Sequence, residues 1–505
     1  MIRTPLRREP SWSVPIAIPR DALPGTDAAS WFTARPRSGP IAGVGIVLAL
    51  ALGWMAIANP KYAVALAAGI ALIAVVIIRP VLGALGLVAL VPALSGLLPG
   101  FPVPNIRISE LLIGTVGLTL LVIARRSAAV PWGLLDWTLL AYGALWTFDG
   151  VLGAVTAHEH LSIGEWGTVA GQLQYFLLYR SLKVTLRSAD DRHLALRVLF
   201  AASGVVALLA ILQEAHAPGV ISLIFTLTGS SAAGGAGGII RATSLFNNWA
   251  ALAGYLLPLV LVGLCLGLAD TIRSYRRTQF TLALILILGL FVTAELSVIV
   301  CLLVGACFLG VRYGRGRVMM RWLGIGLIVV VVGAGGLLGN RLETQFSVNA
   351  GTGRSALVPQ TIAFRWTVWT QQYIPAAERK PFTGYGVELP SSIQWAFPES
   401  QYITFLIQGG LPLLGMFAVL FWAVLREAKR ARQSDDPVDR ALGEGLFVAV
   451  IALGIINFIW PYLSNGGMPQ LLWCLFALFP PVADTSMRAF GPMQQGKLLP
   501  VRTGD

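Results

Sequence analysis

Residues 246–268 read FNNWAALAGYLLPLVLVGLCLGL, a run without a single charged side chain. A helix of about 20 apolar residues is long enough to cross the hydrocarbon core of a bilayer. Similar blocks recur along the 505 residues, of which 56% are hydrophobic and only 12% are charged. A soluble protein of this size carries about 25% charged residues. The sequence therefore predicts an all-α polytopic membrane protein.

Fourteen transmembrane helices are predicted, and they form one membrane domain over residues 39–485. Residues 1–38, rich in Pro, Arg and Ser, are predicted to be a disordered cytoplasmic tail, and residues 486–505 a second cytoplasmic tail. The approximate limits of the spans are Ile41–Ala58, Tyr62–Ile78, Val81–Leu98, Ile108–Ala124, Trp132–Gly153, Trp166–Leu182, Leu194–Gln213, Phe246–Leu268, Phe280–Thr293, Leu296–Val311, Trp322–Gly339, Tyr402–Leu425, Leu446–Tyr462 and Pro469–Val482. Around Glu295, the sequence allows either two spans or one long broken helix.

The orientation follows from the distribution of lysine and arginine. With the N-terminus inside and the spans alternating, 29 of the 37 basic residues lie on the cytoplasmic side and 8 outside. Basic residues accumulate on the cytoplasmic side of membrane proteins, so both termini are predicted to be cytoplasmic. The net charge of +13 is thus spread over short loops, which argues against a nucleic-acid-binding surface. The four cysteines lie inside apolar spans and predict packing residues, with neither a metal site nor a cofactor.

Two long outside loops follow from this topology, at about residues 214–245 and 340–401, and loops of this length are usually functional. The first ends with Arg241 just outside the membrane and with Asn247 and Asn248 at the start of a span, where an asparagine can cap the helix. Arg241 can equally be an interfacial arginine that reaches lipid headgroups.

The second loop contains aromatic residues at helical spacing. Ile362, Trp366, Trp369 and Tyr373 form one apolar stripe, which predicts a helix lying in the membrane interface. Arg365 flanks this stripe, where a lipid headgroup would lie. An aromatic belt with an anchoring arginine is the structural alternative.

The same loop contains Arg341 and the turn-rich segment Lys380-Pro-Phe-Thr-Gly-Tyr-Gly386, and it ends with Glu399 and Tyr402 at the mouth of the next span. Glu399 is the evident candidate base, because the loop contains no histidine. Its alternative role is a helix cap favoured by the helix dipole.

Three other polar features lie on the same side. His158 and His160 have the spacing of a metal-binding pair but no further ligand nearby, so the sequence predicts no metal there. Glu295 and Asp149 lie near the outer ends of apolar spans. Carboxylates in the membrane are candidates for function, although headgroup level is an equally open position for both.

Four motifs in order along the chain resemble the O-antigen ligase and polysaccharide polymerase family. The motifs are Arg241-Ala-Thr-Ser-Leu-Phe-Asn-Asn-Trp-Ala-Ala-Leu-Ala-Gly-Tyr, Phe364-Arg-Trp-Thr-Val-Trp, Pro381-Phe-Thr-Gly-Tyr-Gly and Glu399-Ser-Gln-Tyr-Ile-Thr-Phe-Leu-Ile-Gln-Gly-Gly-Leu-Pro-Leu-Leu-Gly. Together they cover roughly Arg241–Leu425.

The resemblance implies a metal-independent glycosyltransferase of the bacterial inner membrane that acts at its periplasmic or extracellular face. The donor would be an undecaprenyl-diphosphate-linked glycan and the acceptor a glycan or glycolipid, with membrane lipids, a chain-length regulator and a flippase as further partners. Arg241 and Arg365 match the arginines that hold the diphosphate, which arginine forks can stabilise. Glu399 would be the catalytic base, and Tyr402, Arg341, Lys380 and Asn247 would bind substrate.

Two departures from the family pattern refine this expectation. Ligases usually have a histidine where this chain has Glu399, which favours a polymerase or another transferase over a lipid A-core ligase. The family often has a Ser-Arg pair at the outer hairpin, where this chain reads Thr293-Ala-Glu-Leu-Ser297. The alternative function is transport of a lipid-linked oligosaccharide, and a transporter would place polar groups at mid-membrane, often with internal repeats.

Overall fold

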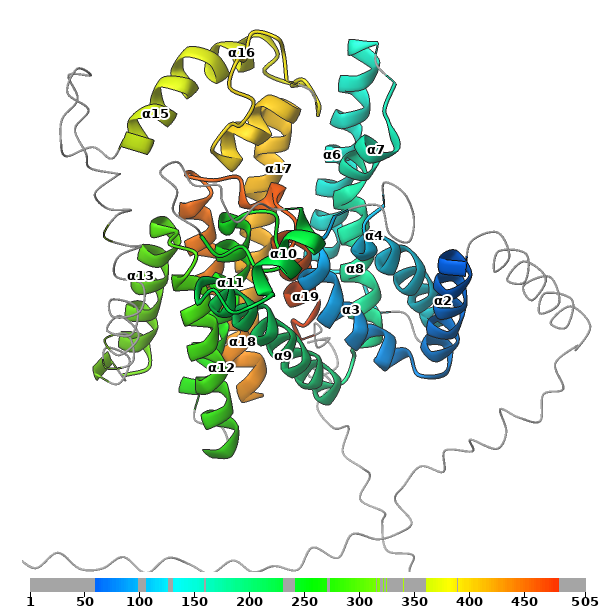
Figure 1. Cartoon of the computed structure of the whole chain (residues 1–505), viewed down its shortest axis with the longest axis vertical. Coiled ribbons are helices and arrows are strands. Elements are labelled where there is room, and N and C mark those ends of the chain that lie inside the picture. Colours follow the sequence, from blue (N-terminus) through cyan, green and yellow to red (C-terminus); the bar gives the residue numbers. More distant parts are fainter. Residues whose placement is uncertain are drawn as a thin grey trace, which may run out of the picture. The chain divides into compact units, whose positions relative to one another are not determined.

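A computed structural model of the chain describes residues 60–98, 106–125, 130–158, 160–229, 241–269, 273–314, 360–387 and 389–480, with a few single positions between 316 and 339. The regular elements within these ranges are all helical, as the sequence predicts (Figure 1). They are α2 (Pro60–Ile78), α3 (Pro80–Leu94), α4 (Ile108–Leu112), η2 (Ile113–Gly117), α5 (Leu118–Ala124), α6 (Leu134–Ala157), α7 (Ile163–Val169), α8 (Gly171–Thr185), α9 (Ala189–Glu214), α10 (Val220–Thr228), α11 (Trp249–Leu268), α12 (Arg273–Phe291), α13 (Leu296–Arg312), α15 (Gln360–Val368), η3 (Trp369–Tyr373), α16 (Ile374–Arg379), α17 (Gln401–Ala431), α18 (Pro437–Ile456), η4 (Tyr462–Ser464) and α19 (Met468–Ala477).

Four of the described helices are long and apolar enough to cross a membrane, at Leu134–Thr156, Ala189–Glu214, Trp249–Leu268 and Gln401–Ala431. Six shorter apolar helices accompany them. The predicted spans Ile41–Ala58 and Trp322–Gly339 lie outside the described residues, so the count of fourteen stays a prediction. The chain divides into two units, Met1–Ala67 and Ala68–Asp505. The second unit contains every site described below.

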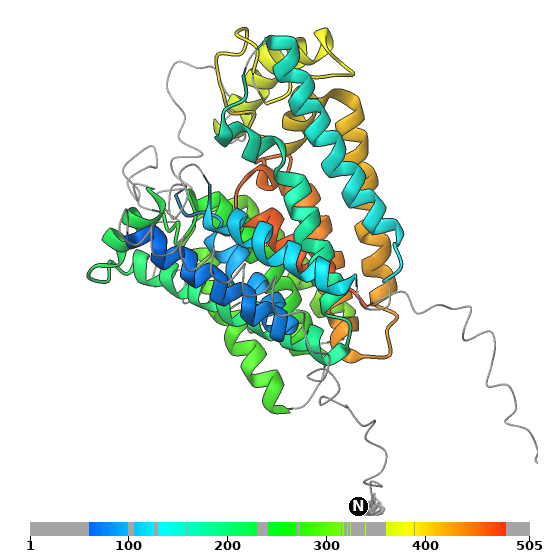
Figure 2. The same ribbon diagram turned by 90° about the vertical axis from the view of Figure 1, so that its right-hand side faces the viewer.

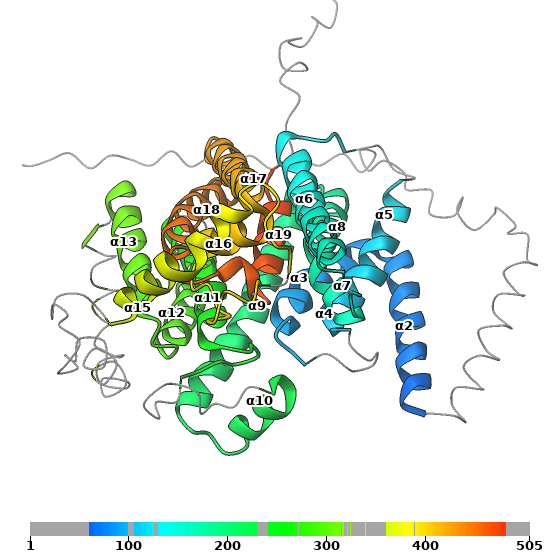
Figure 3. The ribbon, with the colours of Figure 1, turned by 90° about the horizontal axis from the view of Figure 1, so that it is seen from above.

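Helix α11 is the centre of the second unit. Every residue from Ala250 to Leu268 is buried, and α11 packs against α12, α13, α18 and α19. A helix that is apolar on all sides and buried by neighbouring helices is typical of the interior of a bundle. Figures 1 and 3 show α9, α12, α13 and α18 gathered around it.

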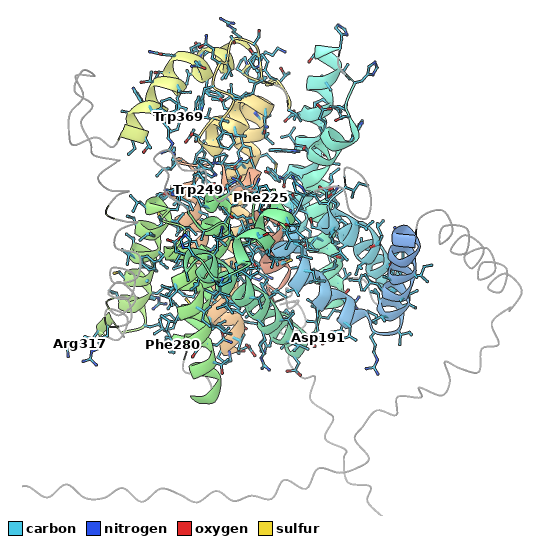
Figure 4. The ribbon with its side chains drawn as sticks, viewed as in Figure 1. Asp191, Phe225, Trp249, Phe280, Arg317 and Trp369 are labelled. Atoms are coloured by element: carbon cyan, nitrogen blue, oxygen red, sulfur yellow. The ribbon has the colours of Figure 1, made fainter. Side chains whose placement is uncertain are left out.

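Several described helix ends lie at opposite ends of the bundle. Figure 4 shows Asp191 at the start of α9, Phe280 in α12 and Arg317 beyond α13 toward one end of the view. Helices α15 and α16 lie at the opposite end (Figure 1). Segments predicted to be cytoplasmic are thus separated along the bundle from the second predicted outside loop.

The structure defines the helix limits in three of the predicted regions. The chain around Glu295 forms two helices, α12 and α13, joined by a tight turn in which Ala294 has a left-handed φ of 49°. The predicted span Trp166–Leu182 is divided, because α7 ends at Val169 and α8 begins at Gly171. The first predicted outside loop also contains a short helix, α10, which was not predicted from the sequence.

Helix α17 is broken at Gly410, whose φ of 64° and ψ of −159° are not helical. The break frees backbone groups that must find partners away from water. The segment 381–386 supplies them, because the carbonyls of Ile407 and Gln408 accept from Tyr385 and Gly386, and Leu411 donates to the Pro381 carbonyl. Figures 1 and 2 show this loop lying against the start of α17.

Candidate functional site

The segment that carries Arg241 is held by buried hydrogen bonds on two sides. The Gln213 side-chain oxygen, at the end of α9, accepts from the backbone N–H groups of Thr243 and Ser244 at 3.0 and 2.8 Å. On the other side, the Ala242 N–H donates to the carbonyl of Val292 in the α12–α13 turn at 3.3 Å. Because buried backbone groups need partners, these bonds determine where the segment lies.

The Arg241 side chain has only 5% of its surface exposed, and its contacts include three described groups. Its guanidinium donates to the Ala294 carbonyl at 3.1 Å and lies 3.8 Å from a carboxylate oxygen of Glu295. It also lies over the ring of Trp249, 4.6 Å from the ring centroid. The arginine is therefore a buried group in a prepared environment, and the snorkelling alternative is wrong for the described structure.

Arg365 and Glu399 form a direct ion pair. The Nε atom of Arg365 donates to Oε2 of Glu399 at 2.9 Å, and a terminal guanidinium nitrogen lies 2.8 Å from the same oxygen. The two side chains are 12% and 15% exposed, so both remain accessible from one side. Charge-assisted bonds of this length are among the stronger polar contacts in proteins.

The helix that carries Arg365 also holds the segment that carries Glu399. Trp369 donates its ring N–H to the Pro398 carbonyl at 2.7 Å, and the Tyr373 hydroxyl donates to the Trp395 carbonyl at 2.5 Å. Burial raises the pKa of Tyr373, and the nearby Glu399 carboxylate raises it further. The predicted aromatic stripe is thus divided, because Trp369 and Tyr373 pack inward whereas Ile362 and Trp366 are exposed.

The start of α17 is bonded to the chain between α18 and α19. Gln401 is fully buried, and its side-chain oxygen accepts from the Leu463 N–H at 2.8 Å. Its backbone N–H donates to the Asn457 carbonyl at 2.8 Å. Glu399, two residues earlier, has a left-handed φ of 55°. Side chains other than glycine avoid this conformation unless the surroundings impose it, so the buried anchor at Gln401 explains how Glu399 reaches Arg365.

Tyr462 is next in the chain to Leu463, whose N–H bonds to the Gln401 side chain at the start of α17. The Tyr462 side chain is fully buried and belongs to η4, in the connection between α18 and α19. Figure 4 labels Trp249, at the start of α11, and Trp369, at the start of η3.

The remaining predicted site residues have different environments. Tyr402 donates its hydroxyl to the Gly454 carbonyl at 2.7 Å, which joins α17 to α18. Lys380 lies over the Tyr385 ring, 4.7 Å from the centroid. Asn247 is exposed and accepts from Asn248, whose own side chain caps α11 as predicted. Arg341 lies outside the described residues. The substrate-binding roles of these residues stay predictions.

Two amide side chains that position the site were not predicted from the sequence. Gln213 and Gln401 are each fully buried at the end of an apolar run. A buried amide side chain forms hydrogen bonds. An isolated glutamine at the end of an apolar run could therefore have indicated a bond to the backbone of another segment. Glu295 was identified as unusual, but its contact with Arg241 was not foreseen.

One cluster of potential metal ligands occurs among the described residues, away from this site. His193, Asp436 and Asp439 bring ligand atoms within 4.8 Å of one another. The same carboxylates are already engaged, because Arg192 lies 2.6 Å from Asp439 and Asp436 caps α18. The cluster therefore joins the starts of α9 and α18 as an ion-pair network.

The described residues form a helical bundle with apolar helices that suit a membrane, and it contains two arginine–carboxylate pairs, Arg241 with Glu295 and Arg365 with Glu399. Residues 281–418 match the family model described as O-antigen ligase. Over this segment, the match confirms the expected resemblance to the O-antigen ligase and polymerase family. The matched segment includes Glu295, Arg365 and Glu399. No curated protein matches the chain.

Proposed function

We propose that this protein transfers an oligosaccharide from an undecaprenyl-diphosphate carrier to a glycan acceptor, without a metal ion. The observation that carries the proposal is the Arg365–Glu399 pair, 2.8 Å apart, inside the segment that matches O-antigen ligases. The membrane helices suit a carrier lipid, and the arginines suit its diphosphate.

In the proposed reaction the acceptor hydroxyl attacks the anomeric carbon of the donor sugar. A new glycosidic C–O bond forms, the bond to the diphosphate oxygen breaks, and undecaprenyl diphosphate leaves with the bonding electron pair. Arg241 and Arg365 stabilise the negative charge that develops on this leaving group, because fixed donors in a water-poor site need little reorganisation. Glu399 takes the proton of the acceptor hydroxyl.

The Arg365–Glu399 pair suggests how the base is prepared. When the diphosphate binds, Arg365 exchanges its carboxylate partner for phosphate oxygens, which guanidinium groups also bind in a forked geometry. Glu399 is then released from the ion pair and is free to accept the proton of the acceptor hydroxyl. Donor binding and activation of the base are thereby linked in the proposed mechanism.

We further propose that the acceptor is a growing polysaccharide and that the reaction takes place at the periplasmic face of the bacterial inner membrane, with both termini cytoplasmic. The glutamate in place of a histidine at position 399 favours a polymerase over a ligase that acts on lipid A-core. The break in α17 would suit a transporter. Its freed backbone groups, however, bond to segment 381–386, so the break anchors the outer loop.

The test is polymerisation by the purified protein in liposomes that contain a lipid-linked repeat unit. Arg365→Ala should lower the rate of polymer formation by about 100-fold or more, the effect of removing one preorganised charge-stabilising donor. Arg379→Ala, in the same loop and exposed, should leave the rate unchanged. Wild-type polymer from both Arg365→Ala and Arg241→Ala, at equal protein levels, would refute the proposal. Flipping of the repeat unit without polymer would instead support a transporter.

A further inference from the structure

The turn between α12 and α13 places a second carboxylate at the site. Glu295 lies 3.8 Å from the guanidinium of Arg241, with 17% of its side chain exposed. Its other carboxylate oxygen accepts from the Ser297 hydroxyl at 2.9 Å. One oxygen is thus held by its own helix, which leaves the other directed at the arginine.

The backbone of this turn is shaped around the same arginine. Ala294 adopts a left-handed φ of 49°, a conformation that residues with a side chain adopt only where the surroundings impose it. In this conformation its carbonyl accepts from Arg241 at 3.1 Å. Two consecutive residues, Ala294 by its backbone and Glu295 by its side chain, therefore contact different nitrogens of one guanidinium.

Trp249 covers a third side of Arg241. The central carbon of the guanidinium lies over the Trp249 ring, 4.6 Å from its centroid. An arginine side chain has several rotatable bonds. It loses conformational entropy when it binds a phosphate, unless its neighbours already hold it in place. Glu295, Ala294 and Trp249 hold Arg241 on three sides.

We propose that Glu295 is a positioning residue of the donor site, which orients Arg241 toward the diphosphate and is itself oriented by Ser297. The inference rests on the proposed function, since it names what Arg241 is oriented for. Glu295 does not take the proton of the acceptor; that role belongs to Glu399. Its effect on the reaction passes through the arginine.

The experiment uses the full-length protein in nanodiscs and measures two quantities for each variant. The first is the dissociation constant and number of sites for undecaprenyl diphosphate, the probe of the donor site. The second is kcat for polymer formation per probe-binding site. Glu295→Gln retains the size of the side chain and removes its charge. Glu110→Gln is the matched control, because Glu110 caps α4 through a 3.0 Å bond from Arg107 and has no contact with Arg241.

We expect Glu295→Gln to lower kcat per binding site by about tenfold or more, since small displacements of a charge-stabilising group are costly. Glu110→Gln should match the wild type. In an Arg241→Lys background, whose ammonium lacks the forked geometry, the further effect of Glu295→Gln should be less than about threefold, because residues that act as a unit are not additive. Ser297→Ala should lower kcat in the same direction and by less.

Three results would overturn the inference. The first is a wild-type kcat for Glu295→Gln. The second is full additivity with Arg241→Lys. The third is a loss of activity that disappears when rates are divided by the number of probe-binding sites, since this would show a role in folding alone. If the wild-type protein itself neither binds the probe nor makes polymer, the proposed function fails, and that outcome is distinct from all three.

Discussion

Replacing Gly410 with alanine should disrupt the hydrogen bonds between the broken part of α17 and segment 381–386. Gly410 has a φ of 64° and a ψ of −159°, a combination available essentially to glycine alone. A Cβ at this position would lie 2.4 Å from the Pro381 carbonyl oxygen, which accepts the Leu411 N–H at 2.7 Å. The backbone strain costs about 1–3 kcal/mol, and loss of the buried hydrogen bond adds about 1 kcal/mol. Together these effects should lower the free energy of unfolding by about 2–4 kcal/mol.

Gly415, five residues further along α17, is the matched control. No atom lies within 4 Å of the position that its Cβ would occupy. Alanine in a helix interior is more favourable than glycine by about 0.5–1 kcal/mol, so Gly415→Ala should be neutral or stabilising. Thermal unfolding in detergent, followed by tryptophan fluorescence, measures both variants. Equal melting temperatures for Gly410→Ala and Gly415→Ala would refute the assigned role of the break.

Three further substitutions test the packing around the site. Gln213→Leu removes the acceptor of two buried N–H groups and should lower the free energy of unfolding by about 2–4 kcal/mol; an unchanged melting temperature would contradict this. Trp369→Phe removes one hydrogen bond to the segment before Glu399, so limited proteolysis should cleave that segment faster than in the wild type, and equal rates would count against the contact. Gly254→Ala would place a Cβ 2.4 Å from the Tyr462 ring and should cost about 1–3 kcal/mol by overpacking, measured by chemical denaturation; a stabilised variant would exclude this close approach.

The helical fold could be predicted from the sequence because the evidence for it is local. The uncharged run at residues 246–268 becomes α11, and α9 follows the predicted span Leu194–Gln213 closely. Asn248 was expected to cap α11 and does so. Each of these features depends on residues that are near one another in the chain, so composition and spacing were sufficient.

The shape of the site could be predicted only in part. The sequence identified Arg241, Arg365 and Glu399 from motif order, but it left each with an alternative structural role. Choosing between those roles needed the contacts of each side chain, such as the bond from Trp369 that holds the segment before Glu399. The break at Gly410 was also missed, because a single residue with an unusual backbone conformation hardly alters the apolar pattern of a span.

By itself, the sequence determined that this is a helical membrane protein and which family its motifs resemble. It also predicted the orientation of the spans. Only the tertiary structure decided that Arg365 pairs with Glu399 and that Arg241 lies against Glu295. The physical reason is that apolar length and charge bias are summed along the chain, whereas an ion pair forms between residues far apart in sequence. Its partners are set by buried amides and strained turns, such as Gln401 and Ala294, whose effect appears only after the helices have packed.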